Sequence, residues 1–287
     1  MNIKKLSALF LCVAFIGAVF TGCGADKAGN KKEAEVKDIR VGMLTHLNAS
    51  EQKINEIMKN IDNNTASIAK LSRNYIYYDK LTSMVMGLES GSIDEMSLYD
   101  SVAKYLIGKN DKLQIIERPG IKLQDSFCFA LRKEDDALEK DLNQTIEIMR
   151  SDGTLDKLVK TYITDLKPGE DPPAVEIPKI AGAPTVKIAV TGDLPPLDLV
   201  LANGKPAGFN TAVIAELSKR LNKNMEIIQV DSAARATALT SKKVDIVFWA
   251  TVPYGETGFP ADIDKPGDLD VTVPYYMDNI VHVGFKK

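Results

Sequence analysis

The chain has 287 residues, of which 45% are hydrophobic and 26% are charged, and its formal net charge is −3. A mildly acidic chain gives no reason to expect a nucleic-acid partner. Its length suits one large domain or two lobes, so the order of predicted elements must decide between them.

Residues 1–22 have the pattern of a secretory signal peptide, with Lys4 and Lys5 ahead of an apolar run from Leu9 to Phe20. The apolar run is short for a membrane span. The segment ends in Thr21-Gly22-Cys23, which resembles the lipobox of bacterial lipoproteins and implies that Cys23 is lipidated. An ordinary signal peptide with a chance cysteine is the alternative. Removing residues 1–22 removes two lysines and no acidic residue, so the mature charge falls from −3 to about −5.

Residues 23–38 are polar, rich in lysine and glutamate, and lack any hydrophobic period. This composition predicts a flexible tether between a membrane anchor and the folded part. After Cys12 leaves with the signal peptide and Cys23 is lipidated, Cys128 has no partner for a disulfide. A lone cysteine in an apolar strand-like run is expected to be buried by packing.

Residues 39–164 alternate apolar strands with amphipathic helices, and two helices close this block. Leu138, Leu142, Ile146 and Met149 lie at helical spacing and predict a buried stripe on the first closing helix. The expected strands are 38–44, 74–78, 92–97, 113–117 and 126–133, and the expected helices are 50–61, 80–91, 98–108, 135–150 and 154–163.

Residues 165–184 contain five prolines and no regular period, which predicts an extended linker. The alternation of strand and helix then restarts over 185–287, with a hairpin whose tip is Asn203-Gly204 and with Asn210 as a helix N-cap. Such alternation favours parallel sheets covered by helices, so the sequence predicts an α/β fold with two lobes.

Several short motifs occur in a fixed order along the two blocks. They are Gly192-Asp193, Pro195-Pro196, Gly208-Phe209-Asn210, Leu239 to Asp245, Pro274-Tyr275-Tyr276 and, in the first block, the run Arg150 to Lys157. With these motifs, residues 185–287 resemble lobe one of the family 3 bacterial extracellular solute-binding proteins, and residues 40–165 are similar to lobe two followed by the family's C-terminal helices. The resemblance implies a two-lobed, type II periplasmic-binding-protein-like fold.

The two blocks stand in the reverse of the family's order. The last strand, in 279–287, looks like the one that crosses into lobe two, and the strand at 38–44 looks like the one that follows it. This order implies a circular permutation in which the linker joins the family's own termini, since the termini of compact domains often lie close together. An incomplete binding domain beside an unrelated α/β domain is the alternative.

Ligands of two-lobed α/β proteins lie between the lobes, beyond the carboxyl ends of the strands. In lobe one, Asp193 and Leu194 follow the first strand, although the family usually has aromatic residues near this point. Trp249 is expected either to stack on a ligand or to pack between helices. The predicted ligand-binding residues at the exit of the strand at 244–250 are Trp249, Ala250, Thr251 and Tyr254.

Amino-acid binders of the family place an arginine after this strand, where it binds the ligand carboxylate in a bidentate fork. No arginine occurs from Thr251 to Lys287. Arg235 could supply the missing charge, although surface solvation is the favoured interpretation for an arginine on a helix. In lobe two, Tyr99 and Asp100 stand where the family has an ammonium-binding aspartate. The family's hydroxyl-bearing helix start falls at Asn48 to Ser50.

The resemblance implies a monomeric, lipid-anchored protein outside the cytoplasmic membrane, or in the periplasm, that delivers a small polar solute to an ABC importer. The solute is expected to be an amino acid or a related compound. An orphan or sensory binding lipoprotein is one alternative, and a periplasmic dehydratase-like enzyme is another. No catalytic residue and no cofactor are expected. No metal site is expected either, because His46 and His282 are the only histidines and neither belongs to a ligand-spaced cluster.

Overall fold

The computed structural model describes residues 37–45, 71–117, 124–253 and 267–287, together with five helical positions between 51 and 59. The chain divides into units of residues 1–35 and 36–287, and every described residue belongs to the second. The predicted signal peptide, Cys23, most of the tether and most of the helix at 50–61 lie outside the described residues. No described helix is long and apolar enough to cross a bilayer.

Lobe one is the part of the sheet with strand order β10-β6-β11-β5, in which β12 also pairs with β5. Its strands β6 and β10 run parallel, and buried Val186, Ile188 and Val190 alternate with exposed side chains along the first half of β6. The elements are β6 (Thr185–Val190), β7 (Asp193–Leu194), β8 (Asp198–Val200), β9 (Pro206–Ala207), α6 (Phe209–Leu221), β10 (Asn224–Gln229), the 3-10 helix η2 (Ser232–Ala234), α7 (Arg235–Thr240), β11 (Ile246–Pro253) and β12 (Leu269–Val271).

Lobe two is the part with strand order β13-β3-β1-β2, and β4 pairs with β13. Met84 and Leu88 of α2 and Val102 of α3 are buried against this part of the sheet. The elements are β1 (Lys37–Leu44), β2 (Leu71–Tyr78), α2 (Leu81–Glu89), β3 (Glu95–Tyr99), α3 (Asp100–Lys109) and β4 (Leu113–Ile116).

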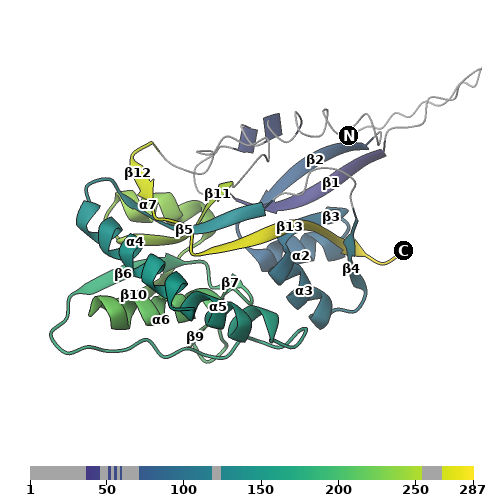
Figure 1. The fold of residues 1–287 in the computed structure, drawn as a ribbon. Coiled ribbons are helices and arrows are strands. Elements are labelled where there is room, and N and C mark those ends of the chain that lie inside the picture. The colour runs from purple at the N-terminus through teal and green to yellow at the C-terminus, as the bar shows by residue number, and fades with distance from the viewer. Residues whose placement is uncertain are drawn as a thin grey trace, which may run out of the picture. The chain divides into compact units, whose positions relative to one another are not determined.

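Two long strands, β5 (Gln124–Arg132) and β13 (Tyr276–Phe285), belong to both lobes (Figure 1). Near its start β13 pairs with β5, and further along it pairs with β3 and β4. The pairing joins the two parts into one ten-stranded sheet. The predicted α/β fold with two lobes is thereby confirmed, and its lobes meet along two continuous strands.

Helices α4 (Asp136–Ser151) and α5 (Thr154–Val159) precede lobe one in the sequence but pack against its helix α6. Arg220 of α6 lies 2.7 Å from the carboxylate of Asp152, and Lys223 lies 2.6 Å from that of Asp141. Of the predicted stripe of α4, Leu142, Ile146 and Met149 are buried and Leu138 is half-buried. A short π-helix, η1 (Lys160–Thr164), extends α5 toward the linker.

The linker at 165–184 has a single isolated β-bridge, between Ala174 and Ala207, as its low periodicity predicts. It nevertheless contacts both lobes. Asp171 accepts a hydrogen bond from the Tyr105 hydroxyl of α3 at 2.6 Å and lies 2.8 Å from Lys109. On the lobe-one side, the Ile180 amide donates to Asn224 at 2.8 Å. The linker is therefore held along the molecule rather than hanging free.

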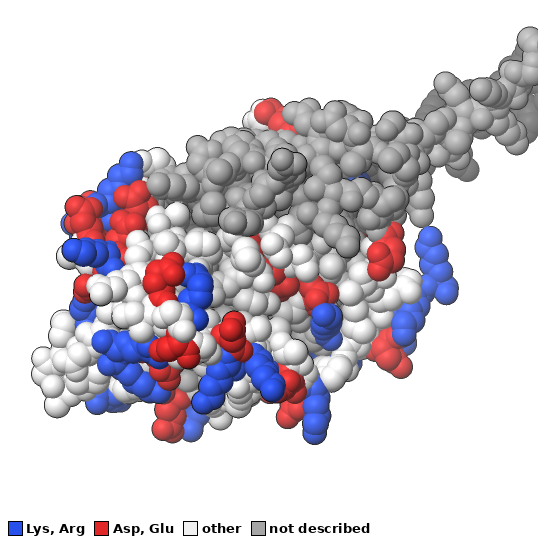
Figure 2. Space-filling model, in the orientation of Figure 1, with Lys and Arg blue, Asp and Glu red and all other residues white. Residues whose placement is uncertain are grey.

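Acidic and basic side chains alternate over the described part of the face in Figure 2. Many are neighbours on one helix, such as Arg150 with Glu147 and Lys219 with Glu216, each pair 2.6 Å apart. Exposed pairs of this kind solvate helix faces and contribute little to stability.

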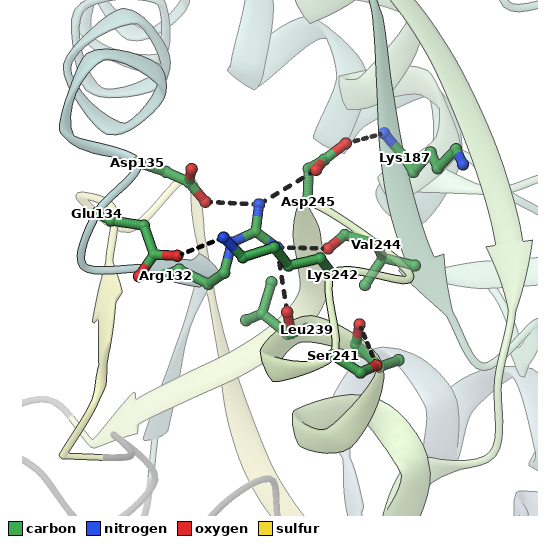
Figure 3. A network of polar contacts seen from close by, with 10 residues as sticks. Arg132, Glu134, Asp135, Lys187, Leu239, Ser241, Lys242, Val244 and Asp245 are labelled. Carbon is green, nitrogen blue, oxygen red and sulfur yellow. Dashed lines mark hydrogen bonds and ion pairs between the residues drawn. The ribbon is translucent and has the colours of Figure 1, made fainter.

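One buried arginine fixes the end of β5 to lobe one (Figure 3). Arg132 is 8% exposed and donates through Nη1 to the carbonyl oxygens of Leu239 and Val244, at 3.1 and 2.7 Å. Its Nη2 lies 2.8 Å from Asp135 and 3.2 Å from Asp245. Because β5 also enters lobe two, this network sets where the connecting strand leaves lobe one.

Two predicted boundaries are wrong for identifiable reasons. The strand expected at 92–97 is β3 (Glu95–Tyr99), and the helix begins at Asp100 because Leu98 and Tyr99 pair with β13. Asn210 lies inside α6, and Gly208 is the N-cap, with a φ of 100° that favours glycine. The predicted hairpin is confirmed, since Leu201 and Lys205 are hydrogen-bonded across its tip. Cys128 is buried as expected, and burial raises the pKa of its thiol to about 12.

Candidate functional site

Asp193 connects the lobes directly. It follows the turn after β6, and its Oδ2 accepts a hydrogen bond from the Leu81 amide at the start of α2, 2.9 Å away. Helix α2 has no side-chain cap of its own, so a carboxylate from lobe one serves its free N–H groups and its positive end. Burial raises the pKa of Asp193, and the N–H groups of Leu81 and Thr82 oppose that shift.

A second carboxylate, that of Asp198, lies near Asp193 on β8, the strand that pairs with β7. It is 2% exposed and accepts from the Gly192 amide at 2.7 Å and from the Thr191 hydroxyl at 3.2 Å. Burial, and then repulsion from Asp193, raise the pKa of Asp198 to about 6.

Arg235, the predicted replacement for the family's arginine, begins α7 and is 1% exposed. The favoured interpretation of surface solvation is therefore wrong. Its Nε donates to the Ser232 carbonyl at 3.0 Å, and its Nη2 donates to the Thr45 carbonyl at the end of β1, 3.1 Å away. Its positive charge also lowers the pKa of Asp198. The guanidinium thus links lobe one to a backbone carbonyl of lobe two.

An exposed ion pair completes this side of the lobe contact. Lys80 Nζ lies 3.0 Å from Asp231, and both side chains are more than half exposed, at 53% and 61%. The three contacts, Asp193 to Leu81, Arg235 to Thr45 and Lys80 to Asp231, define what we call the closed side of the interlobe contact.

On the other side, Tyr99 and Asp100 stand at the junction of β3 and α3. The Tyr99 hydroxyl donates to Asp125 at 3.2 Å, and its ring meets that of Phe127 edge-on at 4.8 Å. Asp100 begins α3 and pairs with Lys104 at 2.6 Å. Tyr99 therefore packs against β5, whereas Asp100 lines a cavity.

This cavity has a volume of about 650 Å³, which falls in the usual range for small-molecule sites. Asp100 and Ser101 border it from the start of α3, Pro196 borders it from lobe one, and Tyr276 and Asp278 border it from β13. Both lobes and a connecting strand thus contribute to its wall. The remaining lining residues are Lys104, Tyr105, Ile107, Gly108, Ile163, Thr164, Leu166, Lys167 and Pro168.

The structure brings some of the predicted residues together and leaves others apart. Asp193, Leu194 and Arg235 lie at or near the closed side, where Leu194 is buried, and Asp100 lines the cavity. Trp249, Ala250 and Thr251 belong to β11, whose register with β5 shifts between Phe248 and Ala250. Whether Trp249 stacks on a ligand stays a prediction. Asn48, Ser50 and Tyr254 lie outside the described residues.

Sequence reasoning missed Ser101, Pro196, Asp198, Tyr276 and Asp278. Pro196 and Tyr276 belong to quoted family motifs, but those motifs did not show which way the side chains would face. The sequence alone could have pointed to Asp278, because a carboxylate in an apolar strand is unusual unless it has partners. Among the described residues, no group of three or more His, Cys, Asp or Glu side chains is placed to hold a metal ion.

Residues 186–254, from β6 through β11, match the family model of bacterial extracellular solute-binding proteins, family 3. Over these residues the chain is similar to that family. The resemblance seen in the sequence is confirmed for this segment, whereas the permuted order of the lobes stays a prediction. No curated protein matches the chain.

Solved structures of solute-binding proteins and regulatory domains are similar at low identity. They include the GluR0 ligand-binding core with L-glutamate, with 9% identity over 88% of this chain and 87% of that chain, at a TM-score of 0.41. A periplasmic substrate-binding protein of an ABC transporter from Coxiella burnetii has 15% identity over 85% and 84%, at 0.39. The effector-binding domain of QuiR with shikimate has 10% identity over 88% of each chain, at 0.42. Because these TM-scores are below 0.5, the description of the fold rests on the strand order of this structure and not on these likenesses.

Proposed function

We propose that this chain is an extracellular solute-binding protein that holds a small polar solute in the cavity between α3, Pro196 and β13. The observation that carries the proposal is that both lobes and a connecting strand line this one cavity. A solute there would contact both lobes at once, so its binding energy would favour their closed arrangement. The family match over 186–254 supports the same role.

A thermal-shift screen with a library of small polar solutes tests this proposal. A solute that binds only the folded chain raises its stability by about 2.7 kcal/mol when its free concentration is a hundred times its Kd. We expect at least one solute class to raise Tm by several degrees.

Two variants place the binding in the cavity. Ser101→Trp projects an indole toward it, and the shift should disappear while the unliganded protein still unfolds cooperatively. Ser151→Trp, at the exposed end of α4, is the matched control and should keep the shift. No response from the whole library, or an unchanged response in Ser101→Trp, would contradict the proposal.

We further infer that Cys23 carries a lipid that anchors the protein to the outer face of the cytoplasmic membrane, from which it delivers its solute to an ABC importer. The signal-like segment at 1–22 and the small residues before Cys23 support the anchor. Cys23→Ser should move the protein from the membrane fraction to the soluble fraction. Mass spectrometry should find an acylated cysteine at the mature N-terminus of the wild type, and an unmodified one would contradict the anchor.

We also infer that the lobes stand in permuted order. Strands β1 and β13 flank β3, and the start of β1 lies at the same end of the sheet as the end of β13. Two strand spacings are about 10 Å, so a linker of about five residues could join Lys287 to Asp38. A chain rearranged in this way and opened within 165–184 should fold cooperatively and bind the same solute. Failure to fold would contradict the inference.

A further inference from the structure

The buried charge that lines the cavity is negative. Asp278 of β13 is 6% exposed, and its carboxylate accepts hydrogen bonds from the Ser101 amide at 3.2 Å and from the Asn279 amide at 2.8 Å. Burial raises the pKa of Asp278, because a carboxylate without a nearby cation is poorly solvated there. An anionic ligand would be repelled at this point, whereas a cation would be attracted.

Ser101 adds a second polar group. Its side chain lines the cavity and the residue is 5% exposed, yet its Oγ makes no hydrogen bond of normal distance and angle. The hydroxyl lies near enough to Asp278 to lower the pKa of that carboxyl. Buried hydroxyl groups are nearly always hydrogen-bonded in folded proteins. A ligand donor placed between Ser101 Oγ and Asp278 would give the hydroxyl a hydrogen bond and add a charged donor to the two amides that Asp278 already accepts from.

Among the described residues that line the cavity, none is a buried positive group that could receive a carboxylate. The two lysines of its wall, Lys104 and Lys167, are exposed, and Lys104 is already paired with Asp100. Arg235 is not among the lining residues, and it donates to carbonyl oxygens on the closed side. The cavity therefore lacks the group with which amino-acid binders hold a carboxylate.

Apolar side chains make up a further part of the wall. Tyr276 also borders the cavity, and its ring packs against Phe127 and Phe209. The apolar side chains are Ile107, Ile163, Leu166, Pro168 and Pro196. Such a wall suits the hydrocarbon body of a ligand, with polar recognition confined to the end near Asp278.

We propose that the solute is a small organic amine without a carboxylate, whose ammonium group lies against Asp278 and Ser101 and whose hydrocarbon body lies against the apolar wall. This inference rests on the proposed function and narrows it to one solute class. It also explains why no arginine follows β11: a solute without a carboxylate needs none.

Matched solutes that differ only in charge test the class by calorimetric titration of the full chain in mild detergent. One set is phenethylamine, phenylalanine and 3-phenylpropanoate, and the other is 3-methylbutylamine, leucine and 4-methylpentanoate. We expect the amine of at least one set to bind at least tenfold more tightly than its amino acid and its acid. Equal or tighter binding of an amino acid or acid would overturn the inference.

Variants then locate the ammonium group. Asp278→Asn keeps an acceptor for the Ser101 amide but removes the charge, and it should weaken amine binding about tenfold to a hundredfold. Ser101→Ala should weaken it by a smaller factor and serves as the second variant if Asp278→Asn does not fold. Asp152→Asn, an acid outside the cavity, should leave it unchanged. Unchanged amine affinity in both Asp278→Asn and Ser101→Ala would overturn the inference.

These outcomes distinguish a failure of the amine solute class from a failure of the proposed solute-binding function. If a neutral or anionic solute of the wider library binds and Ser101→Trp abolishes that binding, the function stands and the amine class is wrong. If no solute of any class binds, the proposed function itself fails.

Discussion

The closed side of the interlobe contact and the cavity beside it use buried polar groups in opposite ways. On the closed side, Asp193 and Arg235 each reach a backbone group of lobe two, so the lobes satisfy one another. In the cavity, Ser101 Oγ makes no hydrogen bond of normal distance and angle, and none of the described residues that line the wall is a buried cation beside Asp278. A buried polar group with a protein partner holds the fold together, whereas one facing a cavity is available to a ligand.

The largest expected effect of breaking the closed side comes from Arg235. Arg235→Met keeps most of the side-chain volume but leaves Asp198 buried without its opposing charge and the Thr45 carbonyl without its donor. We expect the free energy of unfolding to fall by about 3–5 kcal/mol in urea titrations. Lys242→Met, which removes an exposed partner of Glu134, is the control and should unfold like the wild type. A loss no larger than that of the control would show that Arg235 does not join the lobes.

The buried carboxylate of Asp198 should make stability depend on pH. Its pKa is raised from 3.8 to about 6, so between these values the folded state binds more protons than the unfolded state. Stability should therefore fall as pH rises from 4 to 6 and then level off, by about 3 kcal/mol for two pKa units. Asp198→Asn should remove this part of the profile, so the difference between the two curves isolates it. Parallel curves would contradict the assignment.

Asp193 should have a smaller effect, because it provides acceptors for the first turn of one helix. Asp193→Ala removes the acceptor of the Leu81 amide and should lower the free energy of unfolding by about 0.5–2 kcal/mol, as loss of a helix cap does. Asp193→Asn retains an acceptor and should recover part of that loss. If the alanine variant matched the asparagine variant, the hydrogen bond to α2 would not be the source of the effect.

The smallest effect is expected for the exposed pair on the same side. Lys80→Ala removes the ion pair with Asp231, but both side chains are mostly in solvent, where ion pairs contribute little. The midpoint of unfolding should stay within error of the wild type in low and in high salt. A clear, salt-sensitive loss would mean that the exposed pair also holds the lobes together.

Local patterns predict much of this fold. The stripe of Leu142, Ile146 and Met149 is buried on α4 because helical spacing alone places these side chains on one face. Asp193 was predicted because residues that follow strands meet between the lobes of an α/β protein, whereas Asp100 was predicted from the family resemblance.

The burial of Arg235 and the role of Asp278, which sequence reasoning did not foresee, depend on partners far along the chain. Arg235 is buried because its carbonyl partner at Thr45 lies 190 residues earlier. Asp278 caps an amide of α3 that lies 177 residues earlier. Neither distance leaves a mark on the local pattern, so surface solvation was the favoured interpretation for Arg235, and Asp278 was overlooked.

The most direct measurement is a crystal structure of the chain with the solute that gives the largest thermal shift. We expect density for that solute in the cavity between α3, Pro196 and β13, with a ligand nitrogen within hydrogen-bond distance of Asp278 and Ser101. Density at another place, or a ligand whose carboxylate faces Asp278, would contradict it.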